Sequence, residues 1–255
     1  MSPRETLVVD IGNSRIKWAR LSGRELLEPG GASHGESPAA ALQSMVEAQP
    51  KGIGRLVATN VGGEALGRAL TEAAMDAWGT APEFVTPVSA GHGVRNGYSS
   101  PSRLGADRWV ALIAAYQTAG GAASVIDAGT TVTLDAVDAE GQHLGGLIMA
   151  GPKIVCAALD RETSGIGEVG GTPRAPTGLD VLGASTEEAV RNGAMLSIAS
   201  ALDRALAAIA AKLREQPVVY ITGGDARVFS AWLETETQYR ANLVLEGLAY
   251  IATES

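Results

Sequence analysis

One pattern constrains the fold of this chain more than any other: an apolar strand that ends in an aspartate and then turns on a glycine. It occurs twice, as LVVDIGNSRIKW at residues 7–18 and as ASVIDAGTTVTL at residues 123–134. Each copy continues with alternating apolar and polar residues, which is typical of a tight β-hairpin. Asp127 follows Asp10 by 117 positions (127 − 10), close to half the chain. The repeat therefore predicts two similar domains that face each other.

The turn of the first copy has the residue types of an anion-binding site. Gly12 has no Cβ, so backbone N–H groups can approach an anion, and Asn13 and Ser14 add side-chain donors. Lys17 supplies a positive charge, and Asp10 is placed to hold the metal ion of a nucleotide or its water shell. A single copy is more typical of an ordinary hairpin turn. Two copies at matching places favour the two halves of a phosphate clamp.

The composition excludes several functional classes. A length of 255 residues with 45% hydrophobic side chains allows one large domain or two small ones. A net charge of −8 and a pI near 5.0 argue against a nucleic-acid partner, which needs a basic face. The single cysteine, Cys156, excludes an intramolecular disulfide and a thiolate metal cluster. We expect it to be a small buried side chain on a helix.

Two further features bear on localisation. The chain has no run of about 18 or more apolar residues, so we expect no membrane span. Residues 1–6 lead directly into the first strand and lack the basic, apolar and small-residue regions of a secretory signal. We therefore expect a cytoplasmic protein with no membrane partner.

Outside the two hairpins, predicted strands alternate with predicted helices, which favours mainly parallel sheets with crossover connections. GIGEVG at residues 165–170 formally matches a dinucleotide-binding fingerprint, but no strand precedes it, so we reject that interpretation. A glycine pair at 120–121 ends a helix and marks the boundary between domains of residues 1–118 and 119–255. Strands are predicted at 24–27, 55–60, 145–150 and 218–221, and helices at 38–48, 64–78, 106–118, 185–213 and 242–251, with a short helix ending at Leu233.

A second glycine feature follows the strand at 218–221. Gly223 and Gly224 stand between that strand and a helix. Such a pair lets a flat nucleoside or a phosphate lie close against the backbone. A plain tight turn between strand and helix explains it equally well.

The loop at residues 94–108 has the composition of a functional loop. It combines three arginines, a tyrosine and an acid with two glycines, which is unusual for a connector. Asp107 could receive the acceptor's proton in a phosphoryl transfer, or it could be an acid that the helix dipole favours in a first turn. His34, His92 and His143 lie outside both hairpins, so we expect neither a catalytic triad nor a histidine in the clamp.

Seven motifs together resemble one known family, type III pantothenate kinase, also called the Bvg accessory factor family. The resemblance covers nearly the whole chain in the right order, and the Gly-x-Asp-Arg element is its most specific piece. The motifs are DIGNS at 10–14, NGY at 96–98, LGADR at 104–108, DAGT at 127–130, GGLI at 145–148, TGGD at 222–225 and NLVLEGL at 242–248.

The resemblance implies an α/β protein with a two-domain actin-like, ribonuclease H-like fold and duplicated mixed sheets. It implies a homodimer that uses ATP and Mg²⁺, with K⁺ or NH₄⁺ as a monovalent cation. The reaction implied is phosphorylation of pantothenate to 4′-phosphopantothenate, the first step of coenzyme A biosynthesis. Domain 1–118 would carry the first phosphate hairpin and the acceptor loop, and domain 119–255 the second hairpin and the nucleoside-binding glycines.

Carried over onto this sequence, the resemblance also implies a role for each matching residue. Asp107 would be the general base, Asp127 would bind the monovalent cation, Asp10 would hold Mg²⁺, through water where needed, and Thr186 would reach the pantothenate bound by the partner subunit. ATP would contact Asp10, Ile11, Gly12, Asn13, Ser14, Arg15, Ile16, Lys17, Thr130, Gly223 and Gly224, and pantothenate would contact Tyr98, Gly105, Ala106, Asp107 and Arg108.

The sequence departs from the family pattern at three places. Ser14 replaces the commoner threonine and keeps the hydroxyl group. Thr131 stands where alanine is usual after the second clamp. Met149, Ala150 and Gly151 stand where a Pro-Gly turn is usual. The departures at Thr131 and at residues 149–151 both bear on how the second hairpin would hold the cation and the nucleotide.

Two other functions stay open at this stage. An actin-like phosphohydrolase of the exopolyphosphatase type would transfer phosphate to water and would have little use for the loop at 94–108. A non-enzymatic nucleotide-binding regulator would need no catalytic acid, whereas Asp10, Asp107 and Asp127 are all intact. Stimulation of ADP release by pantothenate separates the kinase from both.

Overall fold

The computed structural model describes residues 5–35, 37–49, 52–164 and 181–254. The chain forms two compact units: unit 1 comprises residues 1–120 and 242–255, and unit 2 comprises residues 121–241. The change of unit at residue 120 lies close to the predicted boundary after residue 118. The last helix differs from the expectation, because it belongs with unit 1 rather than with the rest of 119–255. The rejected fingerprint at 165–170 lies outside the described residues.

Unit 1 contains a five-stranded mixed sheet in the order β3-β2-β1-β4-β5. The two pairings around β2 are antiparallel and the two around β4 are parallel, so the prediction of a mainly parallel sheet was wrong. The hairpins are the reason, since a tight turn joins antiparallel neighbours. The strands are β1 (Glu5–Ile11), β2 (Arg15–Ser22), β3 (Glu25–Ser33), β4 (Ile53–Asn60) and β5 (Pro82–Phe84), with a small ribbon of β6 (Ala90–Gly91) and β7 (Val94–Arg95).

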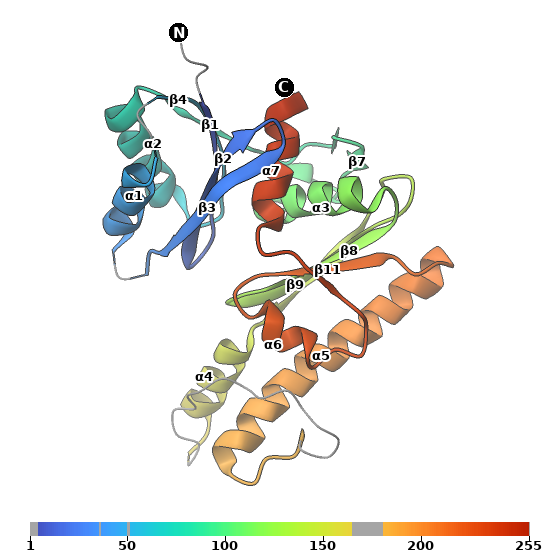
Figure 1. The fold of residues 1–255 in the computed structure, drawn as a ribbon. Helices are drawn as coiled ribbons and strands as arrows, with labels where there is room; N and C mark the ends of the chain where they lie inside the picture. The colour runs from blue at the N-terminus through green and yellow to red at the C-terminus, as the bar shows by residue number, and fades with distance from the viewer. Residues whose placement is uncertain (1–4, 36, 50–51, 165–180, 255) are drawn as a thin grey trace. The chain divides into compact units, whose positions relative to one another are not determined.

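The helices of unit 1 cover both faces of this sheet (Figure 1). Ser37 caps the first helix through its Oγ, which accepts a hydrogen bond from the backbone N of Ala40 at 3.2 Å. Gly79 and Gly120 end the next two helices, each with a left-handed φ of 66°. The helices are α1 (Pro38–Glu47), α2 (Glu64–Trp78), α3 (Ala106–Ala119) and α7 (Leu243–Glu254), with a 3₁₀ turn at Pro101–Arg103.

The alternation of β1 divides its side chains between two faces. Leu7, Val9 and Ile11 point toward α1 and α2 and are fully buried in the main core of unit 1. Val8 and Asp10 therefore point to the opposite face, on the side of the sheet where α3 and α7 lie (Figure 1). The sheet thus presents Asp10 on the same face as α3, the helix that carries Asp107 in its first turn.

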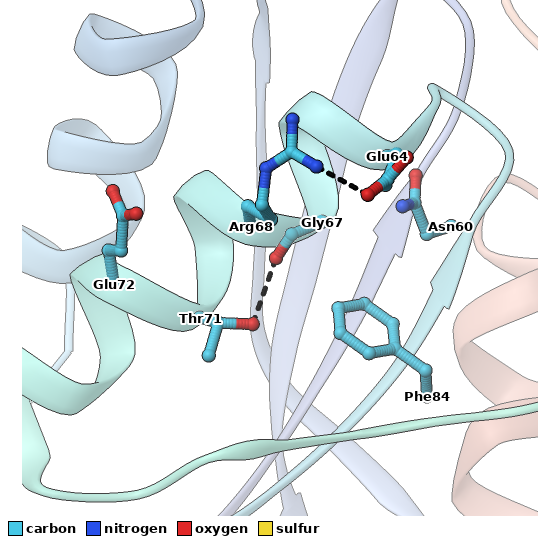
Figure 2. A pocket seen from close by; sticks show the side chains of 7 residues that line it. All are labelled: Asn60, Glu64, Gly67, Arg68, Thr71, Glu72 and Phe84. Atoms are coloured by element: carbon cyan, nitrogen blue, oxygen red, sulfur yellow. Dashed lines mark hydrogen bonds and ion pairs between the residues drawn. The ribbon is translucent and has the colours of Figure 1, made fainter.

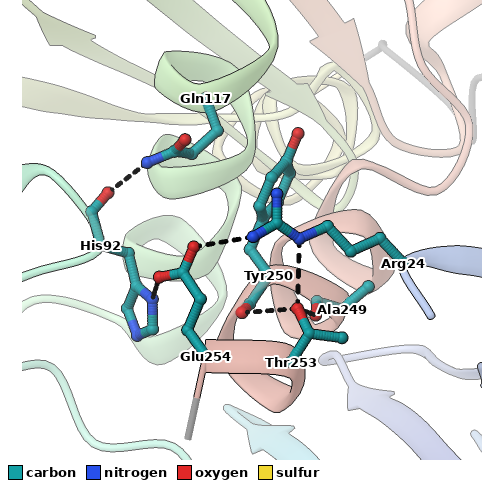
Figure 3. Close-up of polar contacts among 7 residues, drawn as sticks. All are labelled: Arg24, His92, Gln117, Ala249, Tyr250, Thr253 and Glu254. Atoms are coloured by element: carbon teal, nitrogen blue, oxygen red, sulfur yellow. Dashed lines mark hydrogen bonds and ion pairs between the residues drawn. The ribbon is translucent and has the colours of Figure 1, made fainter.

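The C-terminal helix α7 is tightly packed into unit 1. A Cβ on Gly247 would lie 2.1 Å from the carbonyl oxygen of Val110 in α3, so only glycine fits at this crossing. The Glu254 carboxylate accepts a hydrogen bond from Nη2 of Arg24 at 2.9 Å, and its other oxygen lies 2.8 Å from Nδ1 of His92 (Figure 3). The last turn of α7 is therefore held by the β2–β3 turn and by the loop before β7.

Unit 2 repeats the sheet of unit 1. Its order is β10-β9-β8-β11-β12, with two antiparallel pairings followed by two parallel ones. The duplication predicted from the two aspartate motifs is thus present in the topology. The elements are β8 (Ala123–Ala128), β9 (Thr131–Val137), β10 (His143–Ala150), α4 (Pro152–Glu162), α5 (Thr186–Leu213), β11 (Val218–Thr222), α6 (Ala226–Ser230) and β12 (Gln238–Tyr239), so α6 is shorter than the predicted helix ending at Leu233.

Helix α5 supplies the core of unit 2. Ser185 caps it by accepting a hydrogen bond from the backbone N of Glu188 at 3.2 Å. By length and composition alone this helix could cross a membrane, and it is the only such helix in the described part of the chain. Its apolar stripe is explained by packing, because Met195, Ile198, Leu202 and Leu206 are buried in the core of unit 2.

Candidate active site

The β1–β2 turn forms the first predicted clamp. The backbone N of Gly12 donates to the carbonyl oxygen of Arg15 at 3.0 Å and closes the hairpin. Asn13, Ser14 and Arg15 are exposed at its tip, where the sequence predicts phosphate contacts. Ile11 and Ile16 differ, since both side chains are fully buried beneath the turn. A contact from either isoleucine to ATP would have to come from the backbone.

Asp10 stands in a row of three side chains across the sheet. In the strand register it pairs with Lys17 on β2 and with Thr59 on β4. Residues paired in this way project to the same face. The Thr59 hydroxyl donates to Oδ1 of Asp10 at 2.8 Å, and the two residues are 0% and 9% exposed. The row therefore places a cation on one side of the carboxylate and a buried hydrogen-bond donor on the other.

His34 also contacts the first clamp, so the expectation that no histidine lies there was wrong. Its Nε2 lies 2.9 Å from the carbonyl oxygen of Gly12, and its backbone N donates to the carbonyl oxygen of Ser14 at 3.1 Å. The reason is the strand register, because β3 runs antiparallel to β2 and pairs Ser33 with Arg15. The end of β3 thereby returns to the turn, and the buried imidazole packs beneath it.

The hairpin turn of the second clamp is one residue shorter than that of the first. The backbone N of Gly129 donates to the carbonyl oxygen of Thr131 at 3.0 Å. Asp127 pairs with Thr133, six residues on (133 − 127), whereas Asp10 pairs with Lys17, seven residues on (17 − 10). The two motifs therefore match up to the glycine and slip by one residue after it.

The unusual segment before α4 keeps close contact with this second turn. The backbone N of Gly151 donates to the carbonyl oxygen of Thr130 at 3.1 Å. A Cβ on Gly151 would lie 2.4 Å from the same oxygen, so a larger residue would clash with the backbone. Glycine is therefore required here whether or not a proline precedes it.

The glycine pair after β11 lies against the second clamp. Gly223 has a φ of +99°, and a Cβ there would lie 2.5 Å from Oδ1 of Asp127. The backbone N of Asp225 donates to the carbonyl oxygen of Ala128 at 2.9 Å. Unit 2 thus brings together the predicted cation ligand and the predicted nucleoside-binding glycine, with Gly224 exposed beside them.

Unit 1 contains a loop after β4 that corresponds to the glycine pair after β11 and that was not predicted from the sequence. The backbone N of Val61 donates to the carbonyl oxygen of Ile11 at 2.9 Å, the counterpart of the contact between Asp225 and Ala128. Gly62 and Gly63 follow, as Gly223 and Gly224 follow β11. A shared sequence pattern could have revealed it, since both β4 and β11 end in a polar residue shortly before two glycines and a helix.

The loop at residues 94–108, the acceptor loop, contains five residues that are predicted to contact pantothenate. Nη1 of Arg108 donates to the Tyr98 hydroxyl at 3.1 Å, and the guanidinium carbon lies 5.9 Å from the centre of the Tyr98 ring. The backbone N of Arg108 donates to Oδ1 of Asp107 at 2.8 Å. A Cβ on Gly105 would lie 2.6 Å from that carboxylate oxygen. Gly105 therefore gives Asp107 the space it occupies at the start of α3, and Ala106 opens the helix between them.

The acceptor loop carries a guanidinium and a carboxyl group next to each other at the start of α3. Arg108 is only 9% exposed, although a guanidinium is rarely buried without a specific role or partner. Asp107 lies in the first turn of α3, where the helix dipole stabilises a carboxylate. The loop therefore combines a buried guanidinium with a carboxyl group one residue away.

Thr186 is the first residue of α5 and is exposed. It lines a shallow hollow in unit 2 whose other walls are apolar side chains of α4 and α5, among them Val155, Leu159 and Val190. Another shallow hollow lies on unit 1 (Figure 2). There Arg68 pairs with Glu64, and the amide group of Asn60 bonds to the backbone of Gly62 and Gly63. That second hollow contains none of the predicted site residues.

The described residues contain no group of three or more histidine, cysteine, aspartate or glutamate side chains that could hold a metal ion alone. Mg²⁺ in nucleotide sites is commonly bound by one or two carboxylates together with phosphates and water. A single carboxylate at Asp10, at the base of an exposed turn of donors, fits that ligand set.

Comparison with known proteins places the chain in a family. The sequence model for type III pantothenate kinase matches residues 6–208. The type III pantothenate kinase of Nitrosococcus oceani is 37% identical over 254 residues, covering 98% of this chain and 94% of that protein.

Solved structures agree on the fold. A Baf family protein from Campylobacter jejuni has a TM-score of 0.61 at 21% identity, covering 97% of this chain and 98% of that chain. The activator of the 2-hydroxyisocaproyl-CoA dehydratase from Clostridium difficile has a TM-score of 0.52 at 13% identity, covering 98% and 94%. The fold is therefore the actin-like α/β fold that the sequence predicts. With the sequence match spanning most of its length, the chain belongs to the type III pantothenate kinase family.

Proposed function

We propose that this enzyme transfers the terminal phosphoryl group of ATP to pantothenate and forms 4′-phosphopantothenate, the first step of coenzyme A biosynthesis. The observation that carries the proposal is the buried Arg108, joined to Tyr98 and adjacent to Asp107. Pantothenate carries both a carboxylate and a primary hydroxyl group. A guanidinium recognises the first, and a general base can accept the proton of the second.

In this reaction the pantothenate hydroxyl oxygen attacks the γ-phosphorus of ATP. A new P–O bond forms while the bond to the β,γ-bridging oxygen breaks, and ADP leaves with the electron pair. Asp107 takes the hydroxyl proton. Catalysis of such a transfer depends mostly on positioning and charge stabilisation, because the transition state is loose.

The ATP phosphates would lie at the two hairpin turns. Next to Gly12, Asn13 and Ser14 offer donors at the exposed tip of the first turn, and Thr130 does so at the second. Gly224 faces open space in which the nucleoside would lie, and Gly223 allows the backbone to pack closely against Ala128 and Asp127. Asp10 would hold Mg²⁺ with the phosphates, through water where needed, and the ion would neutralise charge on the β- and γ-phosphates.

Asp127 would bind K⁺ or NH₄⁺. The residues that flank Asp127 on the neighbouring strands differ from those that flank Asp10, and the difference supports this assignment. The neighbours of Asp10 include Lys17, whereas those of Asp127 in the same register are Thr133 and Thr222. A carboxylate between two hydroxyl groups offers hard oxygen ligands without a competing lysine.

The active form would be a cytoplasmic homodimer, with Thr186 contributing to the pantothenate site of the partner subunit. The exposed start of α5, beside the apolar hollow formed with α4, supports a contact with a second copy of the chain. The acidic net charge of −8 supports a protein without a nucleic-acid partner.

A coupled assay of ADP release, run with and without pantothenate, tests the proposed function. We expect ADP release to require pantothenate, with 4′-phosphopantothenate detected by mass spectrometry in equal amount. ADP release that is indifferent to pantothenate would favour a phosphohydrolase. Nucleotide binding without any ADP release would favour a regulator.

A further inference from the structure

We propose that Thr59 is a positioning residue for Asp10, fixing the carboxylate that serves the first phosphate hairpin. The inference deepens the proposed function, on which it rests, by adding a residue that the hairpin motif does not contain. Thr59 lies at the carboxyl end of β4, 49 positions from Asp10 in sequence.

The geometry of the pair is that of an oriented carboxylate. The Thr59 hydroxyl donates to Oδ1 of Asp10 at 2.8 Å. The two residues face each other on adjacent parallel strands, which fixes the separation of their Cβ atoms. Thr59 is fully buried, and its branched side chain has few rotamers available. The hydroxyl group therefore restricts rotation of the Asp10 carboxylate about its χ2 angle.

A threonine at the same register position recurs beside the second hairpin, and this argues that its placement is more than local packing. Thr222 lies at the carboxyl end of β11 and pairs with Asp127 in the register that Thr59 and Asp10 share. Thr222 is also buried, with 2% of its surface exposed. A buried threonine beside the clamp aspartate is thus common to both halves of the fold.

The burial of Thr59 gives it a function that a surface residue could not have. A buried hydroxyl must find a hydrogen-bond partner, and the chain satisfies this one with a carboxylate rather than with the backbone. Residues that hydrogen-bond to metal-binding carboxylates orient them, and their loss typically lowers metal affinity or activity by about 10- to 100-fold. We expect Thr59 to act on Mg²⁺-dependent nucleotide binding in this way.

The test compares Thr59→Val, which keeps the shape and removes the hydroxyl, with Thr59→Ser, which keeps the hydroxyl. Calorimetry with Mg²⁺ and a non-hydrolysable ATP analogue, in the absence of pantothenate, measures nucleotide affinity. Thr59→Val should weaken binding by about 10-fold or more, and Thr59→Ser should restore most of it. The kcat of Thr59→Val should fall while the KM for pantothenate stays within about twofold.

Two controls make the result specific. Thr71→Val removes a hydroxyl that donates to the backbone of α2 at 2.9 Å, so it should leave nucleotide affinity unchanged. In an Asp10→Asn background, Thr59→Val should add little further loss, because the group it orients is already altered. Thermal midpoints of all variants separate misfolding from misorientation.

The inference is overturned if folded Thr59→Val binds the Mg²⁺–nucleotide as tightly as the wild type. It is also overturned if Thr59→Ser loses as much affinity as Thr59→Val. The proposed function fails differently, since a wild-type protein that binds nucleotide but ignores pantothenate would refute the kinase and still allow the Thr59 comparison.

Discussion

The guanidinium group of Arg108 donates a hydrogen bond to the Tyr98 hydroxyl at 3.1 Å and lies 5.9 Å from the ring centre. Tyr98→Phe keeps the ring and removes only the hydroxyl group. We expect the KM for pantothenate to rise by roughly tenfold, the usual scale for losing a hydrogen bond to a charged group, with the KM for ATP unchanged. Steady-state kinetics with each substrate varied in turn measures the effect.

A matched control exists in unit 2, where Arg227 lies 4.8 Å over the ring of Tyr239. Tyr239→Phe makes the same change at an arginine–tyrosine pair outside the acceptor loop. Its kinetic constants should equal those of the wild type. An equal rise in the KM for pantothenate in both variants would contradict the role of Tyr98.

Asp107→Asn separates general-base catalysis from a structural role at a helix start. Asparagine is nearly isosteric and can still serve a helix N-terminus, but it cannot accept the proton of the pantothenate hydroxyl. We expect kcat to fall by about 10²- to 10⁴-fold, nearer the lower end because a loose transition state needs little early base assistance. The thermal midpoint and ATP binding should barely change.

Glu64→Gln is the matched control for that substitution. Glu64 is the first-turn acid of α2, as Asp107 is of α3, and it is exposed outside the site. Its replacement should leave kcat unchanged. If Asp107→Asn kept more than about a third of the wild-type kcat, the base would lie elsewhere.

The monovalent cation assigned to Asp127 predicts a dependence on buffer salt. At constant ionic strength, replacing K⁺ with Na⁺ should reduce turnover to the level of the cation-free protein, and adding K⁺ should restore it. Asp127→Asn should abolish the difference between the two buffers, because the ligand that carries the charge is gone. Equal wild-type rates in K⁺ and Na⁺ would refute the assignment.

Thr186→Ala tests whether the pantothenate site is completed by a partner subunit. We expect the KM for pantothenate to rise several-fold, as for loss of about one hydrogen bond, with little change for ATP. Thr163→Ala is the control, since Thr163 is also exposed in unit 2 but bonds only to the backbone of Leu159 at 2.7 Å. Light scattering should show a dimer. A fully active monomer would refute the proposal that Thr186 completes the pantothenate site of a partner subunit.

Cys156 gives a prediction about pH. Burial raises the pKa of its thiol, an effect only partly opposed by the positive charge of Arg191. The native protein should therefore react slowly with a thiol reagent at neutral pH and rapidly once unfolded, because the thiolate is the nucleophile. Thiol titration at several pH values measures both rates.

The same shift has a consequence for stability in alkali. Because the folded pKa lies above the unfolded one, the thiol contributes stability below the unfolded pKa that is lost as pH rises through the folded pKa. Cys156→Ser should make the alkaline decline in the thermal midpoint shallower. Fast labelling of the native protein at neutral pH would contradict the assigned burial.

Local pattern predicted much of the fold. The two hairpins, α2 and the stripe of α5 follow from periodicity and caps that lie within a few residues of each other. The balance of strand directions did not follow, since the hairpin pairs make half of the pairings in each sheet antiparallel, while the alternation of strands and helices indicates only the parallel ones. The placement of α7 in unit 1 depends on tertiary contacts that have no local signature.

The same distinction applies to the site. Motif residues such as Asp10 and Asp107 could be named because each motif is contiguous in sequence. Thr59 and His34 could not, since they reach the first clamp from 49 and 22 positions away. Their contacts depend on which strands become neighbours, and that is decided by the register of the whole sheet.

The return of α7 to unit 1 has a consequence for biosynthesis. Unit 2 is continuous in sequence, so all of it has been synthesised before the final helix is made. Unit 1 begins first but lacks Leu243, Leu245 and Leu248, each fully buried, until translation passes residue 248. The half of the protein that is synthesised first is therefore the half that finishes folding last, and a nascent chain would expose the α7-binding surface of α3 throughout the synthesis of unit 2.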